Sequence, residues 1–433
     1  MGVRIRALGH GGPARLCGTP GAGDTRAPAC LRQQGVDDRG GMRQGVWVHG
    51  AAMTHFGKHV DRTARDLVEE AVSCALREAE LEPRMVQAVF VGNALEGQIS
   101  GQAMIRGQVV LRRTGLMGVP MVNVENADAS GSTALHLGWQ AVASGVYDRV
   151  LVVGYEKYDH EDKVRSYQAA VSNMDLAEVA EIFASGDPGG LSAPTLMLGA
   201  SVADDDTGHI TREAMVEVAV KNHYHGSLNP LARHRKPVTA EQVLASRRVA
   251  GPLTRLMCSS IADGAACLVL GSTRSLPGRN AHAQIVASGL WTGRGDDMRR
   301  QMSTIVGMRD IYETAGIGPE DVDVVELADM TASVELYLYA MMDLCSYDEV
   351  SRFAIDRVTR LGGRVPVNPS GGMLARGNPS GATGVAQVVE LVWQLEGRCG
   401  ERQVASPMVA LAHCAGGWVG TDVGASTVHV LTR

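Results

Sequence analysis

The sequence lacks the features that would place it among membrane or nucleic-acid-binding proteins. No apolar run approaches the roughly 18 residues that suggest a membrane-spanning helix. The net charge of −6 provides no electrostatic basis for binding nucleic acid, which requires cations clustered on one face. We therefore expect neither a membrane span nor a nucleic-acid partner.

Metal and nucleotide motifs are also missing. The eight cysteines are scattered along the chain without the spacing of a metal site, and no secretory hydrophobic segment is evident. Free thiols in a reducing, cytoplasmic compartment are therefore expected. No Gly-x-Gly-x-x-Gly follows a strand and no Gly-Lys-Ser/Thr occurs, so the glycines at 371, 372 and 377 do not indicate a phosphate loop. We expect no metal and no resident cofactor.

What is present is a chain of 433 residues, longer than one average domain and suited to two intimately packed halves. Residues 1–41 are rich in Gly, Arg and Pro and lack helical or strand periodicity, which predicts a disordered N-terminal extension. Translation starting at Met42 is an alternative explanation of this segment.

The remaining chain alternates predicted strands and helices, which indicates an α/β layered fold. In the first half, residues 42–272, the helix is expected at 62–80 and an inserted loop region at about 155–240, with strands near 46–48, 88–91, 119–124, 149–154 and 265–270. The second half, residues 280–433, is predicted to repeat this order: strand near 285, helix 304–315, strand 322–325, helix 381–396, and strands near 409 and 428.

Asp128 lies at the junction between the buried strand predicted at 119–124 and a helix that runs to about Ala143. Unpaired backbone N–H groups and the helix dipole favour a negative group at such a junction. A simple helix cap and a functional anion site are both open interpretations. In either case the helix end should stabilise the carboxylate and lower its basicity.

An internal repeat favours the functional interpretation. The segment Asn378–Gly384 repeats residues 128–134 at an offset of 250, and Ala315–Val325 matches Ala79–Val89 at an offset of 236. Two duplicated βα halves would place the helix beginnings at Asp128 and Asn378 side by side. Two adjacent helix N-termini would stabilise a bound anion or an enolate.

Long segments resemble the thiolase superfamily, most closely the lipid-transfer-protein (sterol carrier) type. The resemblance rests on residues 123–132, 221–230, 252–266 and 367–379, and extends from about Gly45 to the C-terminus. It implies two duplicated halves in an α-β-α-β-α arrangement. It also aligns Asp128 with the position at which the family normally carries its nucleophilic cysteine.

Other catalytic positions implied by the resemblance are altered as well. The family's Gly-His-Pro motif is Gly377-Asn378-Pro379 in this chain, and its His-Asp motif is Ala328-Asp329. Cys414 can be matched to the family's Cys-x-Gly base motif. It would be a thiolate base if a helix end or a cation lowered its pKa, and otherwise a small buried hydrophobe.

The matched segments further imply which residues surround the substrate: His225, Asn229, Ser259 and Asp329. His223 and His225 lack cysteine or carboxylate companions, so a metal site is not expected. The cationic run 233–236 is either a solvated surface or lies beside the phosphates of a coenzyme A substrate, and the resemblance supports the second interpretation.

The altered residues argue against ordinary ping-pong acyl transfer. Attack by the Asp128 carboxylate would give a mixed anhydride, far above a thioester in energy, and each missing histidine donor is worth roughly 3 kcal/mol. Three interpretations remain: an enzyme that performs non-standard acyl transfer or C–C bond chemistry on an acyl-CoA or carrier-bound thioester, a non-catalytic partner of an active thiolase-like subunit, and a carrier-docking module. The steroid side-chain aldolases of this superfamily also lack the nucleophile, but their tyrosine-bearing motifs are absent at 328–331 and 376–380.

We favour the enzyme because His225, Ser259 and Cys414 occur together. The resemblance also implies an assembly. The chain would form a homodimer or higher oligomer through a continuous sheet at strand 119–124, or a heteromer with a small zinc-ribbon/OB-fold protein.

Overall fold

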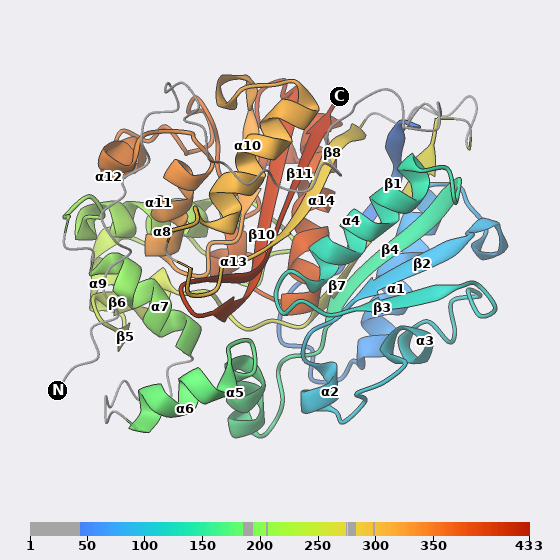
Figure 1. Cartoon of the computed structure of the whole chain (residues 1–433), viewed down its shortest axis with the longest axis horizontal. Coiled ribbons are helices and arrows are strands. Elements are labelled where there is room, and N and C mark those ends of the chain that lie inside the picture. Colours follow the sequence, from blue (N-terminus) through green and yellow to red (C-terminus); the bar gives the residue numbers. More distant parts are fainter. Residues whose placement is uncertain (1–43, 185–193, 205–206, 274, 276–282, 298) are drawn as a thin grey trace.

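The computed structural model describes residues 44–184, 194–204, 207–273, 275, 283–297 and 299–433 (Figure 1). The predicted N-terminal extension, residues 1–41, lies outside the described residues. Most of the residues between the two predicted halves, 42–272 and 280–433, lie outside them as well. Within the described ranges, no helix is long and apolar enough to cross a membrane.

Within the described residues, nine strands form one mixed sheet in the order β3-β2-β4-β7-β1-β8-β11-β10-β9. The first half supplies β1 (Val46–Met53), β2 (Ala88–Gly92), β3 (Met121–Val124), β4 (Arg149–Glu156) and β7 (Gly264–Ser272). The second half supplies β8 (Ala283–Thr292), β9 (Val324–Leu327), β10 (Val409–Val419) and β11 (Asp422–Thr432).

The two halves have the same strand order, β2-β4-β7-β1 and β9-β10-β11-β8. The equivalence extends to the edge, because Val367 pairs with Val325 of β9 in parallel, as β3 pairs with β2. β1 and β8 join the halves through only two residue pairs, Trp47 with Gln284 and Val48 with Ala283. The predicted α/β fold of two similar halves is confirmed, and the two halves share one sheet.

Two equivalent helices, α4 (Ser130–Ala143) and α14 (Ser380–Leu395), pack against each other and against strands of both halves. They approach so closely that a Cβ atom on Gly131 would lie 2.4 Å from the carbonyl oxygen of Gly381. Helix α1 (Ala64–Glu78) packs on β1 and β7, and α10 (Ser303–Ala315) packs on β8 and β11. The result is an α-β-α-β-α arrangement centred on α4 and α14 (Figure 1).

The inserted region lies at one end of the molecule, opposite α1 (Figure 1, green). It contains α5 (Lys163–Val171), α6 (Leu176–Ala184), α7 (Pro194–Ala203), α8 (Arg212–Ser227), α9 (Ala240–Ala245) and the hairpin β5 (Arg248–Ala250) with β6 (Leu253–Thr254). The remaining α-helices are α2 (Glu96–Ile99), α3 (Arg106–Val110), α11 (Ala332–Met341), α12 (Val350–Ile355) and α13 (Gly372–Ala375).

The strand predicted at 119–124 differs from expectation in its burial. It forms β3, an edge strand whose one partner in the described part of the chain is β2, and Val122 is 44% exposed. The expected buried strand was therefore wrong for the single chain. Apolar residues in a short strand fit a covered centre and an uncovered edge equally well, so the sequence alone did not separate the two.

Candidate functional site

The centre of the candidate site is a hydrogen bond between the two halves. Asn378 donates from Nδ2 to Oδ1 of Asp128 over 2.9 Å, and Thr383 donates from Oγ1 to Oδ1 of Asn378 over 2.6 Å. These two contacts fix the orientation of the Asn378 amide, because its oxygen accepts and its nitrogen donates. The two residues predicted to lie side by side therefore touch, at the beginnings of α4 and α14.

Backbone geometry directs Asp128 toward Asn378. Ala127 has a φ of +48°, a left-handed conformation that is uncommon for a residue with a side chain. Helix α4 has Ala129 as its N-cap, and no side chain caps it. The helix-cap interpretation of Asp128 was therefore wrong.

Burial governs the basicity of Asp128, which is only 5% exposed. Removal of the carboxyl group from water raises its pKa, and the hydrogen bonds from Asn378 and Ser380 oppose this rise. The expected decrease in basicity was therefore wrong, because the uncapped helix end does not outweigh the loss of hydration. A raised pKa suits a carboxylate that takes up a proton.

Cys414 lies beside the pair, and its Sγ contacts the backbone oxygen of Asp128 at 3.3 Å. Burial raises the pKa of this thiol, the charge of Asp128 raises it further, and the charge of Arg376 only partly offsets both effects. Cys414 is thus a neutral thiol in the structure. The thiolate base considered from the sequence is not favoured at this position.

Glu156 supports the site from the end of β4, and sequence analysis missed it. Its carboxylate accepts hydrogen bonds from the backbone N–H groups of Ala94, Leu95 and Gly381 and from Nδ2 of Asn93. Burial raises the pKa of Glu156 to about 8 despite these donors. The contact with Gly381 attaches β4 to the first turn of α14. A single carboxylate ending an otherwise apolar strand was the available signal.

The segment containing Ser259 also reaches the site. The Ser259 N–H donates to the carbonyl of Met330 over 2.9 Å, and the Asn378 N–H donates to the carbonyl of Ser260 over 2.8 Å. The loop thus lies between the end of β9 and the beginning of α14. The predicted substrate-binding residue Ser259 thus lies one position before Ser260, whose carbonyl accepts from the Asn378 N–H.

His225 and Asn229 form hydrogen bonds with backbone groups instead. The ring of His225 contacts the Asn368 carbonyl through Nδ1 at 3.0 Å and accepts from the Leu361 N–H at Nε2 over 3.1 Å. Burial lowers the pKa of His225 to about 3. Asn229 donates to the Ser370 carbonyl and accepts from the Leu231 N–H. Both side chains are fully buried, and their hydrogen bonds to the backbone give them a structural role in this part of the chain.

Asp329 is likewise structural in its contacts. Its carboxylate accepts from the N–H groups of Met373 and Leu374 in α13 and from Nδ2 of Asn222. Burial, together with the charge of Glu335, raises the pKa of Asp329. These contacts hold the glycine-rich segment that leads to Asn378. Asp329 therefore supports the site indirectly, through α13.

Thr383 was a second omission of the sequence analysis, although the internal repeat contained the signal. Thr133 and Thr383 occupy equivalent positions in the two copies, and each hydrogen-bonds an asparagine that precedes its helix: Asn126 and Asn378. The hydroxyl groups hold the segments before α4 and α14 against the helices.

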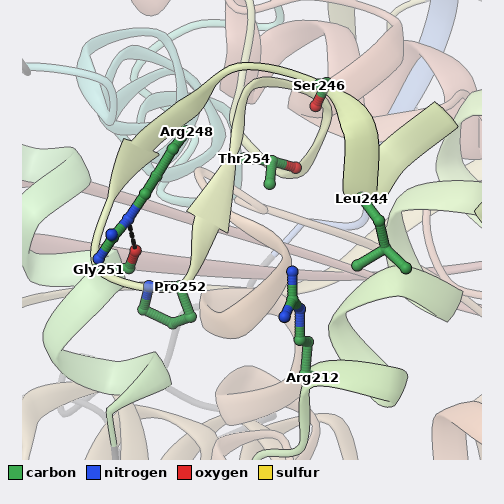
Figure 2. Close-up of a pocket in the computed structure, with 7 residues that line it drawn as sticks. All are labelled: Arg212, Leu244, Ser246, Arg248, Gly251, Pro252 and Thr254. Carbon is green, nitrogen blue, oxygen red and sulfur yellow. Dashed lines mark hydrogen bonds between the residues drawn. The ribbon is translucent and has the colours of Figure 1, made fainter. Parts of the chain in front are cut away.

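A cavity of about 360 Å³ lies elsewhere, in the inserted region (Figure 2). It is lined by Arg212, Leu244, Ser246, Arg248, Gly251, Pro252 and Thr254. None of these is a predicted site residue. Among the described residues, no group of three or more His, Cys, Asp or Glu side chains is arranged to hold a metal ion.

The cationic run 233–236 begins next to the site and ends at the surface. The Arg233 N–H donates to the Arg376 carbonyl over 3.0 Å, and the guanidinium of Arg233 donates to the Ile261 carbonyl. Arg235 and Lys236 are exposed. Both interpretations of this run, a solvated surface and a contact with phosphates, remain compatible with its position.

Comparison with known proteins gives matches along nearly all of the described chain. Residues 46–274 match the thiolase N-terminal domain, and residues 283–433 match the thiolase C-terminal domain-like family. The chain is 35% identical to an acetyl-CoA acetyltransferase of Methanothermobacter thermautotrophicus, with 90% of this chain and 99% of the relative covered. It is 33% identical to the benzoylsuccinyl-CoA thiolase subunit BbsB of Thauera aromatica, with 87% and 96% covered.

Solved structures share the fold at lower identity. Human mitochondrial 3-ketoacyl-CoA thiolase matches with a TM-score of 0.68 and 21% identity, covering 90% of this chain and 99% of that chain. The Ltp2-ChsH2(DUF35) aldolase matches with a TM-score of 0.70 and 23% identity, covering 90% and 98%.

Proposed function

Because this chain belongs to the thiolase superfamily, we propose that it is an enzyme acting on an acyl-CoA or carrier-bound thioester, in which Asp128 moves a proton instead of accepting the acyl group. The reaction is non-standard acyl transfer or the making or breaking of a C–C bond next to the thioester carbonyl. The hydrogen bond between Asn378 and Asp128, where the two helix beginnings meet, carries this proposal.

The proposed step begins with the Asp128 carboxylate removing a proton from the carbon next to the thioester carbonyl. The electron pair of the broken C–H bond moves toward the carbonyl oxygen and forms an enolate. Asn378 has a second amide hydrogen besides the one bound to Asp128, and it can donate to that oxygen. The backbone N–H groups at the beginnings of α4 and α14 add a favourable field for the negative charge.

Exchange of substrate protons with solvent tests this step. Incubated with acetyl-CoA in deuterium oxide, the wild-type protein should incorporate deuterium into the methyl group, measured by mass spectrometry. Asp128→Asn keeps the shape but removes the base, so we expect exchange to fall at least about 100-fold. Exchange should increase with pH through the raised pKa of Asp128, because only the ionised carboxylate accepts the proton.

A matched control separates this role from general disturbance of the site. Thr383→Val removes the hydroxyl that orients Asn378 but keeps the Asp128 carboxylate, so exchange should fall less than in Asp128→Asn. Equal exchange in the wild type and Asp128→Asn would contradict the assignment of Asp128 as the base.

A second candidate is a non-catalytic partner of an active thiolase-like subunit. The near-complete burial of Asp128 and Asn378 favours it, because a substrate needs a way to reach them. Among the relatives, BbsB is named as a subunit of a thiolase. Absence of proton exchange in the isolated chain, combined with a rise in thiolase activity when it is mixed with a complete thiolase subunit, would favour this alternative.

We further infer that β3 lies at an interface in the assembled protein. Its exposed Val122 and its unpaired edge suit pairing with the same strand of a second copy or with a small partner protein. Light scattering at micromolar concentration should therefore give at least the mass of a dimer, and Val122→Lys should shift it toward the monomer. A compact wild-type monomer without a copurifying partner would contradict this inference.

A further inference from the structure

A small apolar cluster, separate from the main core, lies next to Asn378. Its buried members come from α2, α5 and the segment between β4 and α5: Leu95, Ile99, Tyr158, Ala169 and Ala170, with Ala94 and Ile261 packed against them. Ile261 pairs through its backbone with Asn378. The cluster is thereby attached directly to one of the two site residues.

Tyr158 is the one residue of this cluster with a polar group in its side chain. It follows Glu156, whose carboxylate binds the Gly381 N–H in the first turn of α14. Its carbonyl accepts a hydrogen bond from Oγ of Ser166 in α5 over 2.9 Å. The chain after α5 contacts β10, where the Trp418 N–H donates to the Asn173 carbonyl over 2.9 Å. Because Tyr158 shares its cluster with Ile261, whose backbone pairs with Asn378, it lies near the beginning of α14.

Tyr158 is only 6% exposed as a residue, and its hydroxyl forms no hydrogen bond with the described part of the chain. The hydroxyl is not among the fully buried unpaired polar atoms of the described residues, so it keeps some accessible surface at which water or a ligand can accept its hydrogen bond. Its position next to the pair makes a bound thioester a suitable partner.

We propose that the Tyr158 hydroxyl donates a hydrogen bond to the carbonyl oxygen of the bound thioester while Asp128 removes the neighbouring proton. This assignment rests on the proposed function. The tyrosine keeps its proton: the only proton transferred goes from substrate carbon to Asp128, and the hydrogen bond strengthens as negative charge develops on the oxygen. Tyr158 would thus supply a donor at a site whose aligned positions Ala328 and Asn378 carry no histidine.

The surroundings of Tyr158 keep its hydroxyl protonated, so that it can donate a hydrogen bond. Burial raises the pKa of Tyr158, and the nearby charges of Asp128 and Glu156 raise it further. The hydroxyl therefore stays protonated when Asp128 is ionised, which is the state in which Asp128 acts as a base.

The test compares Tyr158→Phe with the wild type in two measurements. The first is deuterium exchange into acetyl-CoA. The second is binding of a CoA thioether that carries a nitronate, which mimics the charge and shape of an enolate. Tyr158→Phe should reduce exchange about 10- to 100-fold and weaken nitronate binding by a similar factor, with little change in acetyl-CoA affinity.

Tyr155→Phe is the matched control, because it removes a buried hydroxyl that also has no hydrogen-bond partner in the described chain. Tyr155 belongs to the core between α1 and the sheet, so exchange and nitronate binding should remain unchanged. Unfolding midpoints of both variants show whether either substitution alters the fold.

The outcomes separate this inference from the proposed function. Unchanged exchange in Tyr158→Phe, with exchange abolished in Asp128→Asn, overturns the role of Tyr158 and leaves the proposed function standing. Absence of exchange in the wild type overturns the proposed function. In that case nitronate binding decides: weakening by Tyr158→Phe still supports the hydroxyl as the donor, and unchanged binding overturns it.

Discussion

Replacing Asp128 by cysteine should give a protein that acetyl-CoA acetylates at residue 128, whereas the wild-type chain should remain unmodified. Thioester exchange between two thiols is nearly balanced in energy, but attack by a carboxylate gives a mixed anhydride that is much less stable. Subsequent turnover of Asp128→Cys should remain poor, because positions 328 and 378, at which the family resemblance implies histidine donors worth roughly 3 kcal/mol each, carry Ala and Asn. Mass spectrometry of the trapped protein and its peptides measures the result.

Asp128→Ser is the matched control, since its hydroxyl fits the same space but lacks the reactivity of a thiol, and it should stay unmodified. Cys414 is an internal control, because its buried neutral thiol should not react in any of the variants. A stable acetyl adduct on the Asp128 peptide of the wild type would contradict our account of the site.

The second large effect is expected at the buried ion pair between Lys221 and Glu335. The two side chains are 1% and 0% exposed, and Glu335 also accepts hydrogen bonds from Asn222, Asn368 and Tyr339. Lys221→Met leaves the fully buried Glu335 carboxylate without its cation. We expect it to lower the free energy of unfolding by about 3–5 kcal/mol, measured by urea denaturation.

The double variant Lys221→Met with Glu335→Gln should recover part of this loss, because it removes the buried charge together with its partner. Arg352→Met is the exposed control. Arg352 and Asp356 are 83% and 54% exposed, so stability should be nearly unchanged. A Lys221→Met variant as stable as the wild type would show that Lys221 does not balance a buried charge.

Local patterns were sufficient to predict most of the fold. The apolar run predicted as a strand at 149–154 became β4, which extends to Glu156, and the helix predicted at 62–80 became α1, whose N-terminus has a capping box between Thr63 and Asp66. The internal repeat also predicted the contact between Asp128 and Asn378. Whether a short apolar strand is central or at an edge depends on its neighbours, which is why β3 was misjudged.

The chemistry of the site was less predictable because it depends on burial. The sequence suggested a helix end beside Asp128 but did not show that Ala129 is the N-cap or that the carboxyl group loses its hydration. The same limit applies to Cys414 and His225, whose contacts come from residues distant in sequence. The residue types indicated which side chains can transfer a proton or donate a hydrogen bond. Their burial and their contacts in the folded chain determine which of them are already bound to the protein.

The position of β1 has a consequence for synthesis on the ribosome. Thr54, directly after β1, hydrogen-bonds Ala265, which lies 211 residues further along the chain. At about 5–20 residues per second, this partner emerges roughly 10–40 s later. During that interval the apolar strand Val46–Met53 has no pairing partner, since its other neighbour β8 is made later still. Among the described strands, β1 is thus made first but stays unpaired until β7 arrives, and its exposed edges can aggregate during that interval.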